Sequence, residues 1–206
     1  MLRLVLKKGR IEEEAVELLE RAGYDVSELR DKDRRLRFAL GGAGIEVVLA
    51  RADDVITYVE HGVCDMGIIG KDTIAECGKP LHEVLDLGFS KCRIAIAGPR
   101  GKGGGGYRAI ATSFPNITRR YLIENGMDAR VIRIDGSVEL APILGLSDAI
   151  VDLVSTGATL EQNGLEVYDE IMKSSARLIV NSASIKLKKA EVGEFINKLK
   201  DALSTT

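Results

Sequence analysis

The residues best suited to chemistry lie between Glu139 and Leu160. An apolar run, Ala149–Val154, carries one acid, Asp152, and leads directly into a loop of small and hydroxyl-bearing residues. That loop reads Ser155, Thr156, Gly157, Ala158, Thr159 and Leu160. A strand that passes through such a loop into a helix leaves backbone N–H groups free to bind an anion, while a carboxylate at the strand end can accept two hydrogen bonds from sugar hydroxyls. Taken alone, these residues are explained equally well by an ordinary helix cap beside a glycine turn.

Basic side chains follow the ends of three other expected strands. Lys8 and Arg10 come after the first strand, Arg51 comes after a later one, and Lys71 follows a buried run. Arginine and lysine at such places can bind the oxygens of pyrophosphate or a triphosphate. The alternative for Lys8 and Arg10 is a solvated turn, and the alternative for Arg51 is an ion pair with a nearby aspartate.

Two further segments have more than one interpretation. Gly136 and Ser137 can present N–H and hydroxyl donors to a phosphate, and Glu139 either joins that site or anchors the neighbouring loop. The run Arg30–Arg37 holds several basic residues. It is either a charged surface loop or an anion-binding contribution to the site of a neighbouring subunit.

The composition excludes several classes of protein. The chain has 206 residues, 45% hydrophobic and 29% charged, as in globular proteins with one domain or two small ones. A net charge of −2 argues against a general nucleic-acid binder, and no stretch approaches the roughly 20 apolar residues of a membrane span. The N-terminus lacks the order of a secretory signal, so we expect a cytoplasmic protein. Three cysteines without paired spacing and two histidines predict neither a zinc site nor a histidine-based nucleophilic pair.

The elements that must position these residues follow a repeating order of strand, turn and helix. This order predicts an α/β fold with largely parallel sheets. We expect strands at 2–6, 36–40, 45–50, 66–69, 81–87, 92–97, 108–112, 129–134, 149–154 and 176–181. We expect helices at 11–22, 53–61, 71–77, 115–125, 138–144, 157–163 and 190–203.

The pattern around the loop resembles the signature of a known family. A strand, an aspartate and a Ser-Thr-Gly-x-Thr loop are similar to the loop that binds 5-phosphoribosyl 1-pyrophosphate (PRPP) in phosphoribosyltransferases. Type I enzymes carry two adjacent acids before this loop, whereas the second position here is Leu153. The longer spacing from Glu139 through Gly145 and Asp152 to Thr159 resembles ATP phosphoribosyltransferase, the first enzyme of histidine biosynthesis.

The resemblance extends over nearly the whole chain. Blocks similar to those of the family occur in the same order at 8–10, 51–55, 58–62, 65–72, 87–93, 97–99, 114–121, 136–139 and 178–181. Each block is weak by itself, but their order is highly specific. One departure is Lys7, which stands where the family usually has proline before Lys-Gly-Arg; it adds a charge and loosens the turn.

The resemblance implies an architecture as well as an activity. The family fold has two α/β lobes with a central cleft, similar to type II periplasmic binding proteins. Lobe I would comprise residues 1–92 plus 177–206, and lobe II residues 93–176 with the PRPP loop. The resemblance places the active site between the lobes.

The implied reaction joins ATP and PRPP. N1 of the adenine attacks C1 of the ribose and pyrophosphate leaves, which gives N1-(5-phosphoribosyl)-ATP. By resemblance, Ser155–Leu160 would bind the 5-phosphate and Asp152 the ribose hydroxyls. The remaining assignments are the catalytic candidates Lys8 and Arg51, the phosphate-binding residues Lys8, Arg10 and Arg51, and the cleft residues Gly136, Ser137, Glu139 and Lys71. Mg²⁺ would arrive chelated by the substrates, with no metal site on the protein.

The resemblance also implies partners. The family has a long form, with a C-terminal domain that binds histidine, and a short form without it. The last expected helix ends at Leu203, so we expect the short form, which works in a hetero-oligomer with a regulatory subunit similar to histidyl-tRNA synthetase. A homodimer of this chain is expected too, and neither nucleic acid nor membrane is an expected partner.

Two other functions compete with this one. A non-enzymatic solute receptor of the same two-lobe shape would bind its ligand without turnover. A type I phosphoribosyltransferase would act on a free nucleobase and not on ATP. The phosphate loop disfavours the receptor, and Leu153 disfavours the type I enzyme.

Overall fold

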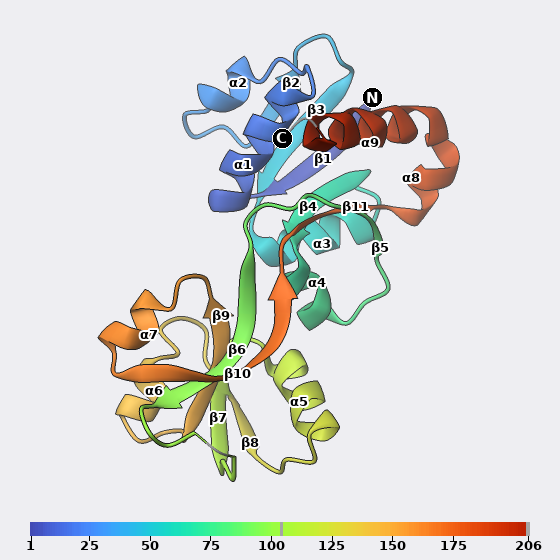
Figure 1. The fold of residues 1–206 in the computed structure, drawn as a ribbon. Helices are drawn as coiled ribbons and strands as arrows, with labels where there is room; N and C mark the ends of the chain where they lie inside the picture. The colour runs from blue at the N-terminus through green and yellow to red at the C-terminus, as the bar shows by residue number, and fades with distance from the viewer. Residues whose placement is uncertain (104, 205–206) are drawn as a thin grey trace. The chain divides into compact units, whose positions relative to one another are not determined.

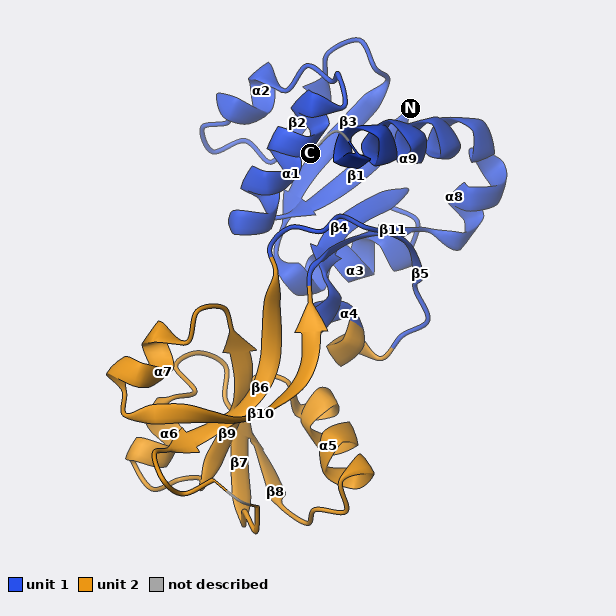
Figure 2. Cartoon of the chain, in the orientation of Figure 1, with its two compact units in different colours: residues 1–74, 79–90, 175–206 blue, residues 75–78, 91–174 orange. Residues whose placement is uncertain are grey.

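The computed structural model describes residues 1–103 and 105–204, and it divides into two compact units (Figures 1 and 2). Unit 1 comprises residues 1–74, 79–90 and 175–206, and unit 2 comprises residues 75–78 and 91–174. The two-lobe α/β class expected from the sequence is therefore present. The lobe boundaries at 92 and 176 remain a prediction.

Unit 1 is built on a six-stranded sheet in the order β2-β3-β1-β4-β11-β5. Its strands are β1 (Leu2–Lys7), β2 (Arg37–Leu40), β3 (Ile45–Ala50), β4 (Met66–Gly70), β5 (His82–Asp86) and β11 (Ala176–Val180). Its helices are α1 (Arg10–Arg21), α2 (Ser27–Arg30), α3 (Ala52–Glu60), α4 (Lys71–Cys77), α8 (Ser182–Leu187) and α9 (Lys189–Ser204), and the last residues of α4 belong to unit 2.

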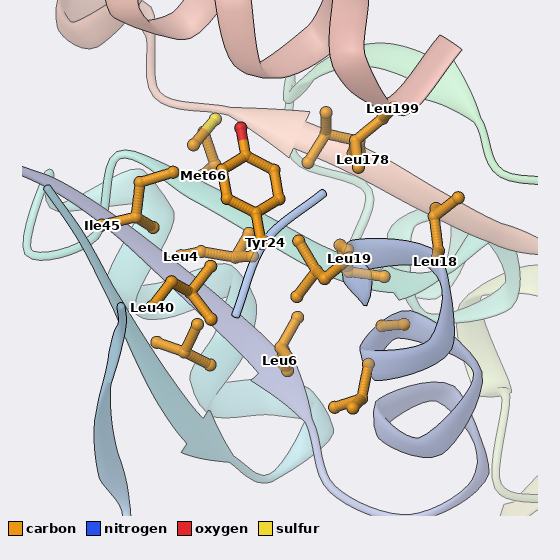
Figure 3. Packing of buried hydrophobic residues seen from close by; sticks show 14 of the residues in the cluster. Leu4, Leu6, Leu18, Leu19, Tyr24, Leu40, Ile45, Met66, Leu178 and Leu199 are labelled. Carbon is orange, nitrogen blue, oxygen red and sulfur yellow. The ribbon is translucent and has the colours of Figure 1, made fainter. Parts of the chain in front are cut away.

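Alternating side chains of β1 divide the core of unit 1 between the two faces of its sheet. Leu4 and Leu6 are fully buried in a cluster with Leu18 and Leu19 of α1 and with residues of α9 (Figure 3). Val5 points the other way, into a smaller cluster with α3. The period of two in the strand and the amphipathic helices thus give a sheet covered on both faces.

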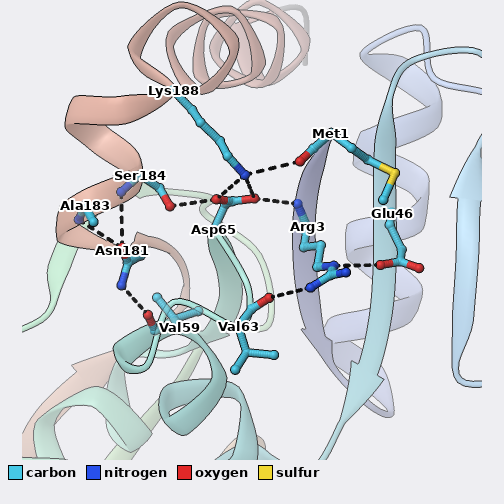
Figure 4. Close-up of polar contacts among 10 residues, drawn as sticks. All are labelled: Met1, Arg3, Glu46, Val59, Val63, Asp65, Asn181, Ala183, Ser184 and Lys188. Atoms are coloured by element: carbon cyan, nitrogen blue, oxygen red, sulfur yellow. Dashed lines mark hydrogen bonds and ion pairs between the residues drawn. The ribbon is translucent and has the colours of Figure 1, made fainter.

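A buried carboxylate fastens the start of this sheet to the C-terminal helices (Figure 4). Asp65, 5% exposed, accepts hydrogen bonds from the backbone N–H of Arg3 at 2.8 Å, from Ser184 Oγ at 2.6 Å and from Lys188 Nζ at 2.9 Å. Burial acts to raise the pKa of Asp65, but these hydrogen bonds outweigh it and hold the pKa below its ordinary value. The contact therefore favours an ionised Asp65.

Unit 2 is built on a five-stranded sheet in the order β10-β6-β9-β7-β8. Its strands are β6 (Cys92–Pro99), β7 (Ala109–Thr112), β8 (Arg130–Arg133), β9 (Ala149–Val154) and β10 (Leu165–Ser174). Helix α5 (Pro115–Glu124) packs on one face, and α6 (Leu140–Ile143) and α7 (Ala158–Gln162) pack on the other. Strands β1 and β9, whose presence in one sheet would contradict the predicted lobes, lie in different sheets.

Two expectations about the sheets were wrong. The sheets are mixed and not largely parallel: β3, β1 and β4 run parallel, as do β9, β7 and β8, whereas the other neighbours pair antiparallel. No strand was expected at 164–175, where β10 lies. Bulges between Val167 and Asp169 and between Glu170 and Met172 interrupt its alternation, which removes the strand signal.

None of the helices that the structure describes is both long enough and apolar enough to cross a membrane.

Candidate functional site

Three neighbouring parallel strands of unit 1 bring predicted cations to one edge of the sheet. Strand β1 pairs in parallel with β3 on one side and with β4 on the other. Lys8 follows β1, Arg51 follows β3 and Lys71 follows β4. The backbone N–H of Lys8 also donates to the carbonyl of Ala50 at 2.9 Å. Because the carboxyl ends of these strands meet, the three basic residues lie along the edge where open α/β sheets bind ligands.

These cations differ in whether an anionic partner already holds them. Lys71 Nζ lies 2.5 Å from the carboxylate of Glu83, and Arg10 Nε lies 3.6 Å from the glutamate one turn on in α1. Lys8 and Arg51 are exposed, and in the described part of the chain neither side chain forms an ion pair. The aspartate partner considered for Arg51 is not engaged there. Lys8 and Arg51 are therefore free to bind phosphate oxygens.

Gly9 gives the turn between Lys8 and Arg10 its shape. Its φ of 97° and ψ of −147° lie in a region open essentially to glycine alone. The Gly9 N–H donates to the carboxylate of Glu12 at 3.3 Å, which is half of a capping box at the start of α1. The turn is thus ordered even though Lys7 replaces the usual proline.

The predicted phosphate loop connects β9 to α7 in unit 2. Gly157 adopts a left-handed conformation with φ 85°, and Thr156 Oγ1 accepts a hydrogen bond from the N–H of Ala158 at 3.4 Å. Leu160 is buried and fixes the loop to the core, whereas Ser155 and Thr159 are exposed. This arrangement leaves hydroxyls and N–H groups at the surface, as an anion-binding loop requires.

Asp152 lies two residues before the end of β9, opposite Ala95 of β6. Burial raises its pKa to about 6; a hydrogen bond with the backbone of Leu153 opposes that rise, and the negative charge of Glu139 adds to it. The structure thus brings Glu139 close enough to Asp152 for their charges to interact. A half-buried carboxylate with a raised pKa beside the predicted phosphate loop is typical of a functional site.

The turn at 136–139 belongs to the same unit. Gly136 and Ser137 are exposed, and Val138 is fully buried, with its N–H donating to the carbonyl of Gly136 at 2.9 Å. Val138 and Leu160 pack in one cluster, which joins this turn to the predicted phosphate loop. Unit 2 therefore groups the turn, the loop and Asp152, whereas the cations Lys8, Arg10, Arg51 and Lys71 belong to unit 1.

Two arginines beside the loop, Arg93 and Arg100, were not predicted as site residues from the sequence. An open depression of about 400 Å³ is lined by Arg93, Arg100, Thr156, Gly157, Leu160, Glu161, Leu165, Glu166 and Val167. Arg93 Nη1 lies 3.4 Å from Glu170, and its buried Nε has no hydrogen-bond partner among the described residues. The alternation of side chains along β6 could have placed Arg93 beside the loop. Arg93 lies two residues before Ala95 and hence on the face of the sheet that α7 covers.

Comparison with known proteins agrees with the resemblance seen in the sequence. The family described as ATP phosphoribosyltransferase matches residues 51–201. A Clostridium kluyveri ATP phosphoribosyltransferase is 52% identical over 201 residues, which is 96% of this chain and 92% of the relative. A Listeria monocytogenes protein of the same name is 46% identical over 204 residues, which is 98% of this chain and 96% of the relative.

Solved structures give the same family and the same fold. The ATP phosphoribosyl transferase (HisG:HisZ) complex from Thermotoga maritima contains a chain with a TM-score of 0.86 and 37% identity, with all of both chains covered. A Candida albicans gene product with the generic periplasmic binding protein fold has a TM-score of 0.62 at 11% identity, over 98% of this chain and 70% of the other, and so supports the fold alone. The chain thus belongs to the ATP phosphoribosyltransferase family.

Proposed function

We propose that this chain transfers the 5-phosphoribosyl group of PRPP to N1 of the adenine of ATP, with release of pyrophosphate, as the first step of histidine biosynthesis. The observation that carries the proposal is the β9–α7 loop with Asp152 before it, in a chain of this family. A ring nitrogen attacks with its own lone pair, so the reaction needs no protein base. It needs alignment of the reactants and stabilisation of the charge that develops on pyrophosphate.

Unit 2 is assigned to the ribose and its 5-phosphate. The N–H groups and hydroxyls of Ser155–Leu160 bind the 5-phosphate, and Asp152 accepts hydrogen bonds from the ribose hydroxyls. A ligand that donates to the Asp152 carboxylate, or brings a cation beside it, favours the ionised form and lowers its raised pKa. Gly136, Ser137 and Glu139 complete the surface around the sugar.

Unit 1 is assigned to the polyphosphates. Lys8 and Arg51, which have no anionic partner in the described part of the chain, stabilise the leaving pyrophosphate, and Arg10 binds pyrophosphate or ATP phosphates. Lys71, held by Glu83, has the weaker assignment of lining the same edge. Lys8 and Arg51 are the groups we expect to affect the chemical step.

Mg²⁺ is assigned to the substrates. Within the described residues no three histidine, cysteine or acidic side chains gather as a metal centre would need, and Asp152 and Glu139 together supply two carboxylates. Such a pair suits a substrate that carries its own cation. Chelated by the polyphosphate, Mg²⁺ supplies neutralisation of the charge on the leaving group.

The proposed partner is a regulatory subunit similar to histidyl-tRNA synthetase, with this chain also pairing as a homodimer and working in the cytoplasm. The similar Thermotoga maritima structure is a HisG:HisZ complex, and the match covers all of this chain and all of that chain. Four exposed aliphatic side chains within seven residues of unit 2 support a protein partner; they are Leu140, Ile143, Leu144 and Leu146. Full, histidine-sensitive activity from this chain alone would contradict the partner.

Substitution of Thr156 by valine tests the loop assignment. Thr156→Val removes the hydroxyl and keeps the branched shape, and loss of one hydrogen bond to a charged phosphate raises KM for PRPP by roughly 10-fold or more. The matched control is Thr57→Val, because Thr57 donates its hydroxyl only to the carbonyl of Asp53 inside α3. The control leaves KM unchanged. An unchanged KM for PRPP in Thr156→Val, with the fold retained, would remove the loop from the site.

A further inference from the structure

Glu12, on the first turn of α1, is an acid whose side chain is buried. Its neighbour Glu13 is exposed, whereas Glu12 is only 4% exposed. Ionised side chains are rarely buried unless their oxygens are paired. Both oxygens of Glu12 have partners, and those partners come from different parts of unit 1.

One carboxylate oxygen fixes the turn that carries the phosphate-binding cations. Glu12 Oε2 accepts a hydrogen bond from the N–H of Gly9 at 3.3 Å. The preceding N–H, that of Lys8, donates to Ala50 at the end of β3. The two successive amides thus donate to acceptors in two different elements, β3 and α1, and these two bonds hold Gly9 at its φ of 97°. The directions in which Lys8 and Arg10 leave the backbone depend on these anchors.

The other oxygen is neutralised from a distant segment. Glu12 Oε1 lies 2.5 Å from Nζ of Lys32, which stands 20 residues away in the loop between α2 and β2. The ammonium group balances the buried negative charge, so the carboxylate does not cancel the positive charge that Lys8 and Arg10 offer to a polyphosphate. Lys32 therefore allows an acid to serve as the anchor inside a site for anions.

We propose that Glu12 is a positioning residue, which holds the Lys8-Gly9-Arg10 turn in the form that binds pyrophosphate. The inference rests on the proposed function and deepens it, because it names the group that sets the geometry of the polyphosphate cations. Glu12 touches neither substrate. It acts through the N–H of Gly9, with its charge balanced by Lys32.

Three substitutions at position 12 separate the hydrogen bond from the charge. Glu12→Gln keeps an oxygen that can accept from Gly9 and removes the charge. Glu12→Asp keeps the charge on a side chain one methylene shorter, which cannot reach Gly9 from the same backbone. Glu12→Ala removes both. Glu13→Ala is the matched control, since Glu13 is an exposed acid on the same turn.

The readout is the Kd of pyrophosphate by calorimetry, together with KM for PRPP, kcat and the midpoint of thermal unfolding. We expect Glu12→Asp and Glu12→Ala to raise the Kd of pyrophosphate at least 10-fold, Glu12→Gln to raise it less than 3-fold, and Glu13→Ala to leave it unchanged. If Glu12→Ala does not fold, the Kd values of pyrophosphate for Glu12→Asp and Glu12→Gln still show whether the hydrogen bond to Gly9 positions the turn.

A purely structural role predicts a different result. Glu12→Asp and Glu12→Ala would then lower the unfolding midpoint and bind pyrophosphate as tightly as the unsubstituted chain, which would overturn the proposal. So would Glu12→Gln binding as weakly as Glu12→Ala. Failure of the proposed function is distinguishable, because the unsubstituted chain would then form no product from ATP and PRPP even with the regulatory subunit present.

Discussion

Substitution of Asp152 by asparagine makes the protein more stable and less able to bind PRPP. Burial raises the pKa of Asp152 from 3.8 to about 6, so the folded chain holds its ionised form at a disadvantage near neutral pH. A difference of about 2 units, at about 1.4 kcal/mol each, is worth about 3 kcal/mol. Asparagine has a similar shape and no charge, so Asp152→Asn raises the free energy of unfolding at pH 7.5 by up to about 3 kcal/mol.

The gain in the free energy of unfolding depends on pH in a way that identifies Asp152 as its cause. Because the folded-state pKa of Asp152 lies above its unfolded value, the stability that this group contributes is fully present below pH 3.8 and is lost as the pH rises through about 6. The difference between Asp152→Asn and the unsubstituted chain therefore grows from near zero at pH 4 to its full size above pH 7. Urea unfolding at both pH values measures it, and steady-state kinetics measure the rise in KM for PRPP.

A matched control lies four residues earlier. Asp148 accepts hydrogen bonds from the N–H groups of Arg108 and Ala109, which lower its pKa. Asp148→Asn therefore changes stability in the opposite direction and lowers it at pH 7.5. The reasoning about Asp152 would be refuted if Asp152→Asn were no more stable than the unsubstituted chain at pH 7.5, or if its gain were as large at pH 4.

Two further predictions concern other residues. Gly157→Ala places a Cβ on a left-handed residue, which costs about 1 kcal/mol of stability in urea unfolding and raises KM for PRPP; equal PRPP kinetics would contradict the role of the loop. Asp65→Asn weakens the contacts with Arg3, Ser184 and Lys188 and lowers the free energy of unfolding by about 2 kcal/mol at pH 7. Because the pKa of Asp65 is lowered in the folded chain, the deficit should shrink as the pH falls through that pKa, and a constant deficit would contradict this.

Local periodicity predicted many elements of the fold and could not predict their pairing. The bounds of β3, α4 and β9 are those expected from the sequence, because β3 and β9 are largely apolar runs that end before Arg51 and Ser155, and α4 lies between Gly70 and Gly78. Which strands become neighbours is decided by contacts far apart in the chain, and this is why β6 pairs antiparallel with both β9 and β10. The bulges in β10 interrupt its alternation of apolar and polar side chains, so the sequence did not predict this strand.

Some residues of the candidate site could be predicted from the sequence, and others could not. Lys8, Arg51 and the Ser155–Leu160 loop were predicted because each follows an expected strand, and strand ends are visible in the sequence. Arg93 was missed because its place beside the loop depends on its pairing with Val154 across the sheet. The burial of Glu12 was equally hidden, since its partner Lys32 comes from a separate loop.

The central claim is that this chain joins ATP to PRPP. The direct measurement incubates the chain with ATP, PRPP, Mg²⁺ and pyrophosphatase, with and without a regulatory subunit, and follows the ultraviolet absorbance of N1-substituted adenine. We expect that absorbance to rise with ATP, to depend on PRPP, and to rise faster when the subunit is present. Turnover of a free nucleobase but not of ATP, or binding of PRPP without any product, would contradict the proposed function.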